Sequence, residues 1–181
     1  MGLQSVFHIL MDKNDAIARL AKQIDAARKS EPSLATAEEV AALRRQGACQ
    51  LHQICAEFVA SLNSKLSDAA LELSPPAYTP EAFREPGVNL FQIASQGREI
   101  QIAFQSTREL FSTEKFPIPY VLEGEVRTYN QRMLERFEIR NDRLFLCLHE
   151  RVVFWRFFDW RGDRTAPVDT NLLASLMQRL F

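Results

Sequence analysis

The stretch 152–160, VVFWRFFDW, decides the fold that we expect for this chain. Successive side chains of a β-strand point to opposite faces, so this stretch separates into two sets. The first set is Val152, Phe154, Arg156, Phe158 and Trp160, and the second is Val153, Trp155 and Phe157. A strand with apolar residues on both faces is usually covered on both. The sequence therefore predicts a central strand whose second face is covered by N-terminal helices, a C-terminal helix or a second subunit.

The strand pattern continues backwards from this stretch to residue 89. A period of two residues predicts further strands at 89–95, 99–106, 120–130, 133–140 and 144–149. Gly97 lies between the first two of these strands, and Asn141 and Asp142 precede the last, as is typical of tight turns. Tight turns join antiparallel neighbours. We therefore predict an antiparallel sheet of about five to six strands.

Helices are predicted on both sides of this strand-rich region. Asp169 or Thr170 can cap a C-terminal helix. That helix carries Leu172, Leu173, Leu176, Met177 and Leu180. Before the strands, Thr36 and Glu39 form a capping box that opens a helix running to about residue 66. Gly47 lies on the apolar face of this helix, where it either marks a close crossing with another helix or has no special role.

The first part of the chain carries another helical pattern. Apolar residues spaced by three and four form a heptad seam, namely Leu3, Val6, Leu10, Ile17, Leu20, Ile24 and Ala27, with Lys13 in the one missing place. A continuous helix over 3–29 reaches roughly 40 Å. Alternatively, Asp12, Asn14 and Asp15 cap a second start near residue 15. Pro32 ends this segment, so we expect an antiparallel hairpin with the next helix.

Prolines separate the helical part of the chain from the strand-rich part. The segment 74–80, SPPAYTP, excludes a regular helix or a central strand. The sequence thus predicts an α+β fold with a long helical hairpin at 1–73, a proline-rich linker at 74–87 and a sheet with a C-terminal helix at 88–181. Because the hairpin exposes apolar residues and the last strand needs a cover, we expect one cooperative unit.

The composition is that of a folded protein of the bacterial cytoplasm. Of 181 residues, 46% are hydrophobic and 25% are charged, and the formal net charge is −1. No run approaches the ~20 apolar residues of a membrane span, and no signal-peptide pattern is present. Three cysteines, an odd number, are typical of a reducing compartment. The excess of Arg over Lys is typical of a GC-rich bacterial genome. We therefore expect a cytoplasmic protein without a membrane partner.

Two groups of cysteine and histidine are candidates for chemistry. Cys49, His52 and Cys55 are spaced by three residues on one helix, but a closed zinc site needs further ligands that the sequence does not offer. Cys147 and His149 share a strand face roughly 7 Å apart, which is too far for a thiol to bond its base. Buried free cysteines explain both patterns. We therefore predict no metal, no cofactor and no catalytic residue.

Three charged residues on predicted strands are the candidate ligand-binding residues. Arg156 lies on a largely apolar face, where a cation needs an acidic partner such as Glu135 or Glu138, a strand edge, or a bound anion. Glu123 and Glu125 share a strand face, and two such carboxylates are able to hold Mg²⁺ or to act as acid and base. A charge-paired sheet face is the simpler explanation of the two glutamates.

A non-catalytic oligomerising or adaptor protein is the function that we expect. The heptad seam has no other evident purpose, and a helix of this length extends beyond strands that span roughly 20–27 Å. An apolar stripe left in water favours a symmetric dimer. The predicted interface of this homo-oligomer consists of Leu3, Val6, Leu10 and Ile17. A different protein partner is the alternative occupant of the same surface.

Two other functions remain as alternatives. In the first, a pocket between sheet and helices binds an anionic small molecule, or acts as an enzyme, with Arg156 at its end. In the second, single-stranded nucleic acid stacks on the aromatic residues of segment 127–164, which holds nine Arg and six acidic residues. The net charge of −1 makes nucleic acid the weaker alternative, since phosphate contacts need an excess of basic residues.

Overall fold

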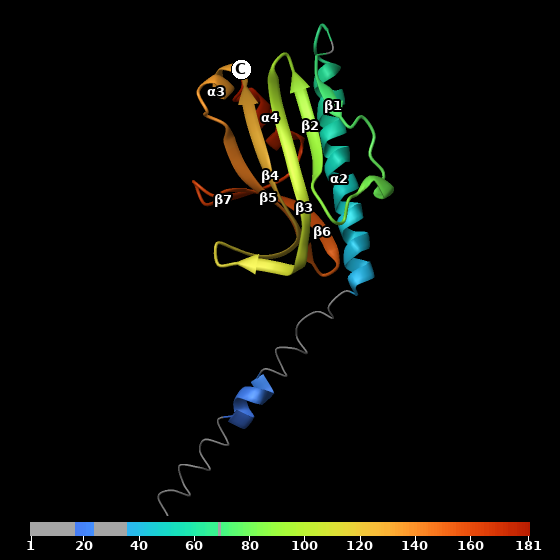
Figure 1. The fold of residues 1–181 in the computed structure, drawn as a ribbon, viewed down its shortest axis with the longest axis vertical. Coiled ribbons are helices and arrows are strands. Elements are labelled where there is room, and N and C mark those ends of the chain that lie inside the picture. Colours follow the sequence, from blue (N-terminus) through green and yellow to red (C-terminus); the bar gives the residue numbers. More distant parts are fainter. Residues whose placement is uncertain (1–16, 24–35, 69) are drawn as a thin grey trace, which may run out of the picture. The chain divides into compact units, whose positions relative to one another are not determined.

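The structure, a computed structural model, is shown in Figure 1, and the residues that it describes are 17–23, 36–68 and 70–181. Contacts divide the chain into two compact units, Met1–Thr36 and Ala37–Phe181. No helix of the described residues is long and apolar enough to cross a membrane.

The N-terminal unit is helical at 17–23, where the side chains are exposed. The predicted hairpin with the next helix does not match the structure, because the helix at 17–23 and α2 (Ala37–Asn63) belong to different units. The physical reason is that α2 buries its apolar face against the sheet of its own unit. Leu3, Val6 and Leu10 of the predicted interface lie outside the described residues.

The larger unit is an α+β fold built on one antiparallel sheet. Its seven strands neighbour each other in chain order. They are β1 (Glu72–Ser74), β2 (Asn89–Ser95), β3 (Arg98–Thr113), β4 (Phe116–Asn130), β5 (Arg140–His149), β6 (Val152–Asp159) and β7 (Arg164–Pro167). The remaining helices after α2 are the 3₁₀ turn η1 (Pro80–Ala82), α3 (Gln131–Glu135) and α4 (Thr170–Gln178).

The sheet differs from the predicted five to six strands in two respects. The short edge strands β1 and β7 were missed, because three or four residues are too few to establish a period of two. The strand predicted at 133–140 is wrong over most of its length. Asn130 accepts a hydrogen bond from the backbone nitrogen of Met133 and so caps the short helix α3 in its place.

The main core lies between one face of the sheet and the two helices α2 and α4. The face consists of alternate residues from β2 to β6, and its largest members include Phe91, Ile102, Leu122, Leu146 and Trp155. Phe104 lies between Phe91 and Trp155 in edge-to-face contacts with ring centroids 5.2 and 5.5 Å apart. As predicted from the period of two, Val153, Trp155 and Phe157 share this face.

Gly47 lies where α2 approaches the sheet closely. A Cβ atom at this position would lie 2.2 Å from Cδ2 of Leu146. The Nε1 of Trp155 donates a hydrogen bond of 2.7 Å to the Gly47 carbonyl. Gly47 therefore marks a close approach, but the partner is strand β5 and not a helix, so the predicted helix crossing is corrected to a helix–sheet contact.

The face of β6 that carries Phe154 and Phe158 is partly covered by the sheet itself. Phe158 and Cys147 form a separate cluster with Phe116 and Tyr120, which belong to the first residues of β4. The β3–β4 pairing shifts register between Ser106 and Thr113, and this end of the hairpin turns away from the direction of the sheet (Figure 1, yellow). Bulges of this kind bend strands. Two of the three covers considered from the sequence, an N-terminal helix and the C-terminal helix, are found on the opposite face, where α2 and α4 form one core with Val153, Trp155 and Phe157. On the face of Phe158 a folded strand end provides the cover, which the sequence did not predict.

The proline-rich segment 74–87 packs on α2. His52 lies with Nε2 2.9 Å from the Pro75 carbonyl, and its ring stacks on that of Tyr78. The Tyr78 hydroxyl donates to Oδ1 of Asn89, which also accepts from the backbone nitrogen of Arg84. These bonds join the segment to α2 and to the start of β2 within the larger unit. That the whole helical part and the sheet form one cooperative unit stays a prediction, which limited proteolysis within 74–80 would test.

Candidate functional site

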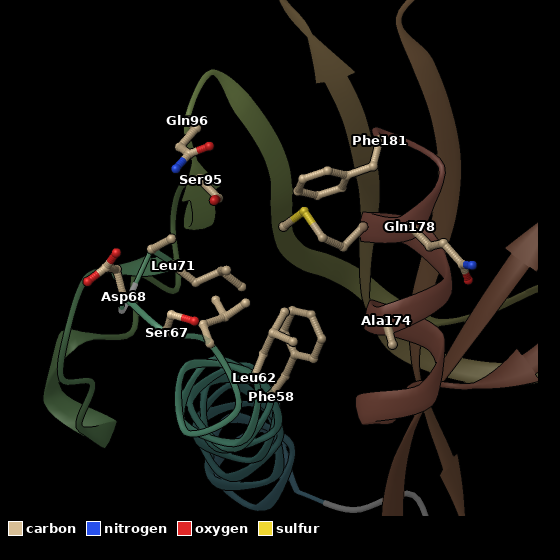
Figure 2. Close-up of a pocket in the computed structure, with 13 residues that line it drawn as sticks. Phe58, Leu62, Ser67, Asp68, Leu71, Ser95, Gln96, Ala174, Gln178 and Phe181 are labelled. Carbon is tan, nitrogen blue, oxygen red and sulfur yellow. The ribbon is translucent and has the colours of Figure 1, made fainter.

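A groove of about 570 Å³ lies between the C-terminal end of α2, the turn joining β2 to β3, and α4 (Figure 2). The α2 side is formed by Phe58 and Leu62, which are spaced by four residues along one helix face, and by Leu66, which lies beyond the helix end at Asn63. Clefts of about 300–1,000 Å³ with mainly apolar walls are typical of small-molecule sites. This groove is therefore the candidate site of the compact unit.

Asn63 shapes the groove where α2 ends. Its Oδ1 accepts hydrogen bonds from the backbone nitrogens of Ala70 and Leu71, and its Nδ2 donates to the Leu71 carbonyl. The chain is thereby turned back at the helix end, and Leu71 is placed beside Phe58 on the floor of the groove. Asparagine suits this role because its side chain can serve free backbone groups as both donor and acceptor.

The groove has an apolar floor and a polar margin. Phe58, Leu71 and Met177 form the floor and are only 4%, 7% and 3% exposed. The polar lining residues are Ser67, Asp68, Ser95, Gln96 and Gln178. In Figure 2 the carboxylate of Asp68 and the amide of Gln178 point away from the centre, whereas Phe181 and Leu71 face each other across it. A ligand in the groove would therefore meet mainly hydrocarbon.

A second, polar cavity of about 400 Å³ adjoins the groove. Both cavities are lined by Gln96 and Phe181, and the second is also lined by Arg98, Arg132 and Glu135. The Arg98 guanidinium carbon lies 4.0 Å from the Phe181 ring centroid, and its Nε donates a 3.1 Å hydrogen bond to the Leu180 carbonyl. An arginine stacked on an aromatic ring is held in place, while some N–H groups of its guanidinium stay available for hydrogen bonds.

The groove was missed at the level of sequence. Phe58 and Leu62 lie on the predicted apolar face of α2, and Met177 lies on that of α4, whereas Leu66, predicted on the same face as Phe58, lies beyond the end of α2. Periodicity, however, reports that a side chain is turned inward, and it does not report whether the space opposite is filled.

Arg156 lies on the outer face of β6, between Phe154 and Phe158 in sequence and opposite Phe145 of β5. It is half-buried, and its Nε is buried without a hydrogen-bond partner. No ion pair joins it to any acidic residue that the structure describes, so the predicted bridges to Glu135 or Glu138 are not formed. The observation leaves Arg156 as a candidate for an anion contact.

Glu123 and Glu125 lie on the same outer face, in β4. Glu125 accepts a 2.7 Å hydrogen bond from Asn141 and forms an ion pair with Arg127, and Glu123 accepts a 3.2 Å bond from Gln105. Both are thus engaged with polar neighbours. Glu123 lies opposite Phe145, which in turn lies opposite Arg156, so an aromatic ring separates these two predicted site residues.

The candidate cysteines and histidines differ in burial and in hydrogen bonding. Cys55 and Cys147 are fully buried, and burial raises the pKa of each thiol to about 12, with Arg156 acting in the opposite direction on Cys147. His52 is engaged with Pro75, and His149 is exposed. Among the described residues, no group of three or more His, Cys, Asp or Glu side chains is placed to hold a metal.

The aromatic residues proposed to stack nucleic acid are distributed over three environments. Trp155 is in the main core, Phe154 packs against the second cluster, and Phe137 and Trp160 are exposed. Arg161 lies over the Trp160 ring at 4.7 Å. They do not form a row along one face, which is how successive bases are stacked.

Models of protein families gave no match to this chain, and neither curated proteins nor solved structures matched it significantly. The function is therefore inferred from the geometry of the chain itself.

Proposed function

We propose that this is a non-catalytic binding protein whose compact unit holds an apolar ligand in the groove between α2 and α4. The observation that carries the proposal is the groove itself, with a volume of about 570 Å³ and a floor of Phe58, Leu71 and Met177. Protein interiors are otherwise packed to the density of organic crystals, so an open apolar space of this size is a natural ligand site. Met177 adds adaptability, because the unbranched thioether fits many shapes.

Titration with the neutral fluorescent probe N-phenyl-1-naphthylamine tests this proposal. We expect saturable binding to the full chain, and a loss of at least about tenfold in affinity in Ala174→Trp, whose indole would occupy the groove. The matched control is Ser175→Trp, because Ser175 is the next residue of α4, is exposed and does not line the groove. Equal binding by Ala174→Trp and the unmodified protein would contradict the proposal.

Self-association through the N-terminal segment is a second candidate function. It is supported by the helix at 17–23, in which Ile17 and Leu20 lie three residues apart on one face and are 66% and 55% exposed. Apolar side chains in this arrangement are typical of helix–helix interfaces. They continue the seam predicted from Leu3, Val6 and Leu10.

Sedimentation equilibrium at micromolar concentration tests the second candidate. We expect a dimer that dissociates in Leu10→Glu and in Ile17→Glu, because a charge on the seam cannot be buried unpaired. Ala18→Glu is the matched control, since Ala18 lies beside the seam. A strictly monomeric unmodified protein would refute self-association and leave the groove unaffected.

A further inference from the structure

The groove and the polar cavity beside it form one amphipathic site. They share Gln96 and Phe181, which lie on the two sides of the same end of the groove in Figure 2. A molecule that fills the groove and passes between these two side chains would enter the second cavity. Hydrocarbon surrounds it at one end and hydrogen-bonding groups at the other.

The charges at the two ends differ in sign. The polar cavity is lined by Arg98 and Arg132 against one acidic residue, Glu135, which accepts a hydrogen bond from Gln131. Among the described residues that line the groove, Asp68 alone has a charged side chain, and its carboxylate points outward in Figure 2. An anionic group would thus be favoured at the arginine end and disfavoured near Asp68, which fixes one orientation of the ligand.

The two arginines retain hydrogen-bonding capacity. Arg98 uses Nε for the Leu180 carbonyl and Nη1 for a long bond of 3.4 Å to the Gln96 carbonyl, which leaves Nη2 without a partner in the described chain. The side chain of Arg132 makes no hydrogen bond or ion pair with a described residue and is exposed. Guanidinium groups match a carboxylate in a bidentate geometry.

We infer that the site binds a free single-chain amphiphile with a carboxylate head group, of the fatty acid class. The chain lies over Phe58, Leu71 and Met177, and the carboxylate lies at Arg98 and Arg132. The inference rests on the proposed function, because it requires that the groove take an apolar ligand. It adds the chemical class of that ligand, its orientation and the residues that select it.

Displacement of N-phenyl-1-naphthylamine by dodecanoate and by dodecanol tests the inference. The two compounds have the same hydrocarbon chain and differ in the head group, so the ratio of their affinities measures the contribution of the charge. We expect dodecanoate to bind about tenfold more tightly than dodecanol at low salt, with the preference declining as salt is added.

Arginine variants locate the selective group. In Arg132→Gln the preference for dodecanoate should fall about threefold, and in Arg98→Gln/Arg132→Gln it should nearly disappear. Arg136→Gln is the matched control, because Arg136 follows the same short helix and does not line the cavity. Because Arg98 also binds the Leu180 carbonyl, the melting temperature of each variant is measured, and Arg132→Gln, which alters no internal bond, decides the matter if the double variant is unstable.

The outcomes separate the two claims. If the probe and dodecanol bind but dodecanoate binds no more tightly than dodecanol, the inference is overturned. The same holds if Arg132→Gln and Arg136→Gln have equal effects. In both cases the proposal that the groove binds an apolar ligand is unaffected. If neither compound displaces the probe and Ala174→Trp binds it normally, the proposed function fails as well. Tighter association with anionic phospholipid vesicles than with monomeric dodecanoate would overturn the assignment of a free amphiphile, and so would displacement of the probe only by an amphipathic helical peptide.

Discussion

The two ends of α2 meet their surroundings in opposite ways. Near its beginning, Arg44 and Gly47 bring the helix into direct contact with the sheet. Near its end Leu62, and just beyond its end Leu66, line an open groove. The same apolar face is therefore packed against the sheet at one end of the helix and open to a ligand at the other. A binding site can thus arise where an ordinary core face is left without a packing partner.

The closed end depends on two residues that bulky apolar side chains could not replace. Arg44 is buried, donates a 3.0 Å hydrogen bond from Nε to the Val121 carbonyl, donates to the Thr107 carbonyl and forms an ion pair with Glu85. Gly47 removes the side chain that would collide with Leu146. The open end has neither device, and its polar connections run along the chain from Asn63 to Leu71.

Replacing Arg44 should have the largest effect on this comparison. Arg44→Met removes a donor from the Thr107 carbonyl and one of two donors from the Val121 carbonyl, and it leaves Glu85 without its partner. We therefore expect a loss of roughly 3 kcal/mol in the free energy of unfolding. Urea denaturation measures it. Arg45→Met is the control, because Arg45 is the exposed neighbour on the same helix. A loss of less than about 1 kcal/mol in Arg44→Met would show that the closed end is held by apolar contacts alone.

The pH dependence of stability should report the burial of Cys55 midway along α2. Its thiol has a pKa of about 12 in the folded protein, against an ordinary value of 9.0. The unfolded thiol therefore loses its proton first, and stability present below about pH 9 should decline as the pH rises towards 12. We expect a loss of roughly 2 kcal/mol over the first 1.5 pH units.

Urea denaturation at each pH gives this slope, and Cys55→Ala separates Cys55 from other groups that titrate in the same range. The variant should be less stable at neutral pH but lose less stability on going to alkaline pH. Parallel curves for the two proteins would mean that Cys55 is accessible to water.

Gly47→Ala should destabilise the protein although alanine is the better helix former. The substitution gains about 1 kcal/mol of helix propensity, but the new methyl group meets the fully buried Leu146 and overpacks the core, so we expect a net loss of about 1 to 2 kcal/mol. Gln46→Ala, at the exposed neighbouring position, should change stability by less than about 0.5 kcal/mol. A stabilised Gly47→Ala protein would show that the close approach of α2 to β5 is not required.

Leu66→Ser should have the smallest effect on stability, because Leu66 is an exposed wall of the open end. We expect a change of less than about 0.5 kcal/mol by urea denaturation, together with weaker binding of the naphthylamine probe. If stability instead falls as it does for Arg44→Met, the groove is closed in solution and the contrast between the two ends is lost.

Local patterns in the sequence were sufficient for several parts of the fold. Alternation in 152–160 correctly assigned Trp155 and Phe158 to opposite faces of a strand covered on both. Asp169 caps α4 by accepting a hydrogen bond from the backbone nitrogen of Leu172, as its position predicted. Gly97 adopts a positive φ in the turn between β2 and β3. Each of these features depends on residues that are close together in the chain.

What covers each face, and what is left uncovered, was decided only by the tertiary structure. The α+β class, the antiparallel sheet and the inward side of α2 follow from the sequence, because periodicity records which side chains avoid water. The fold of the β3–β4 hairpin over Cys147, the buried Nε of Arg156 and the groove beside Met177 do not. They depend on how closely elements far apart in the chain approach one another. The sequence pattern of an apolar face is the same whether the space opposite that face is filled or left open.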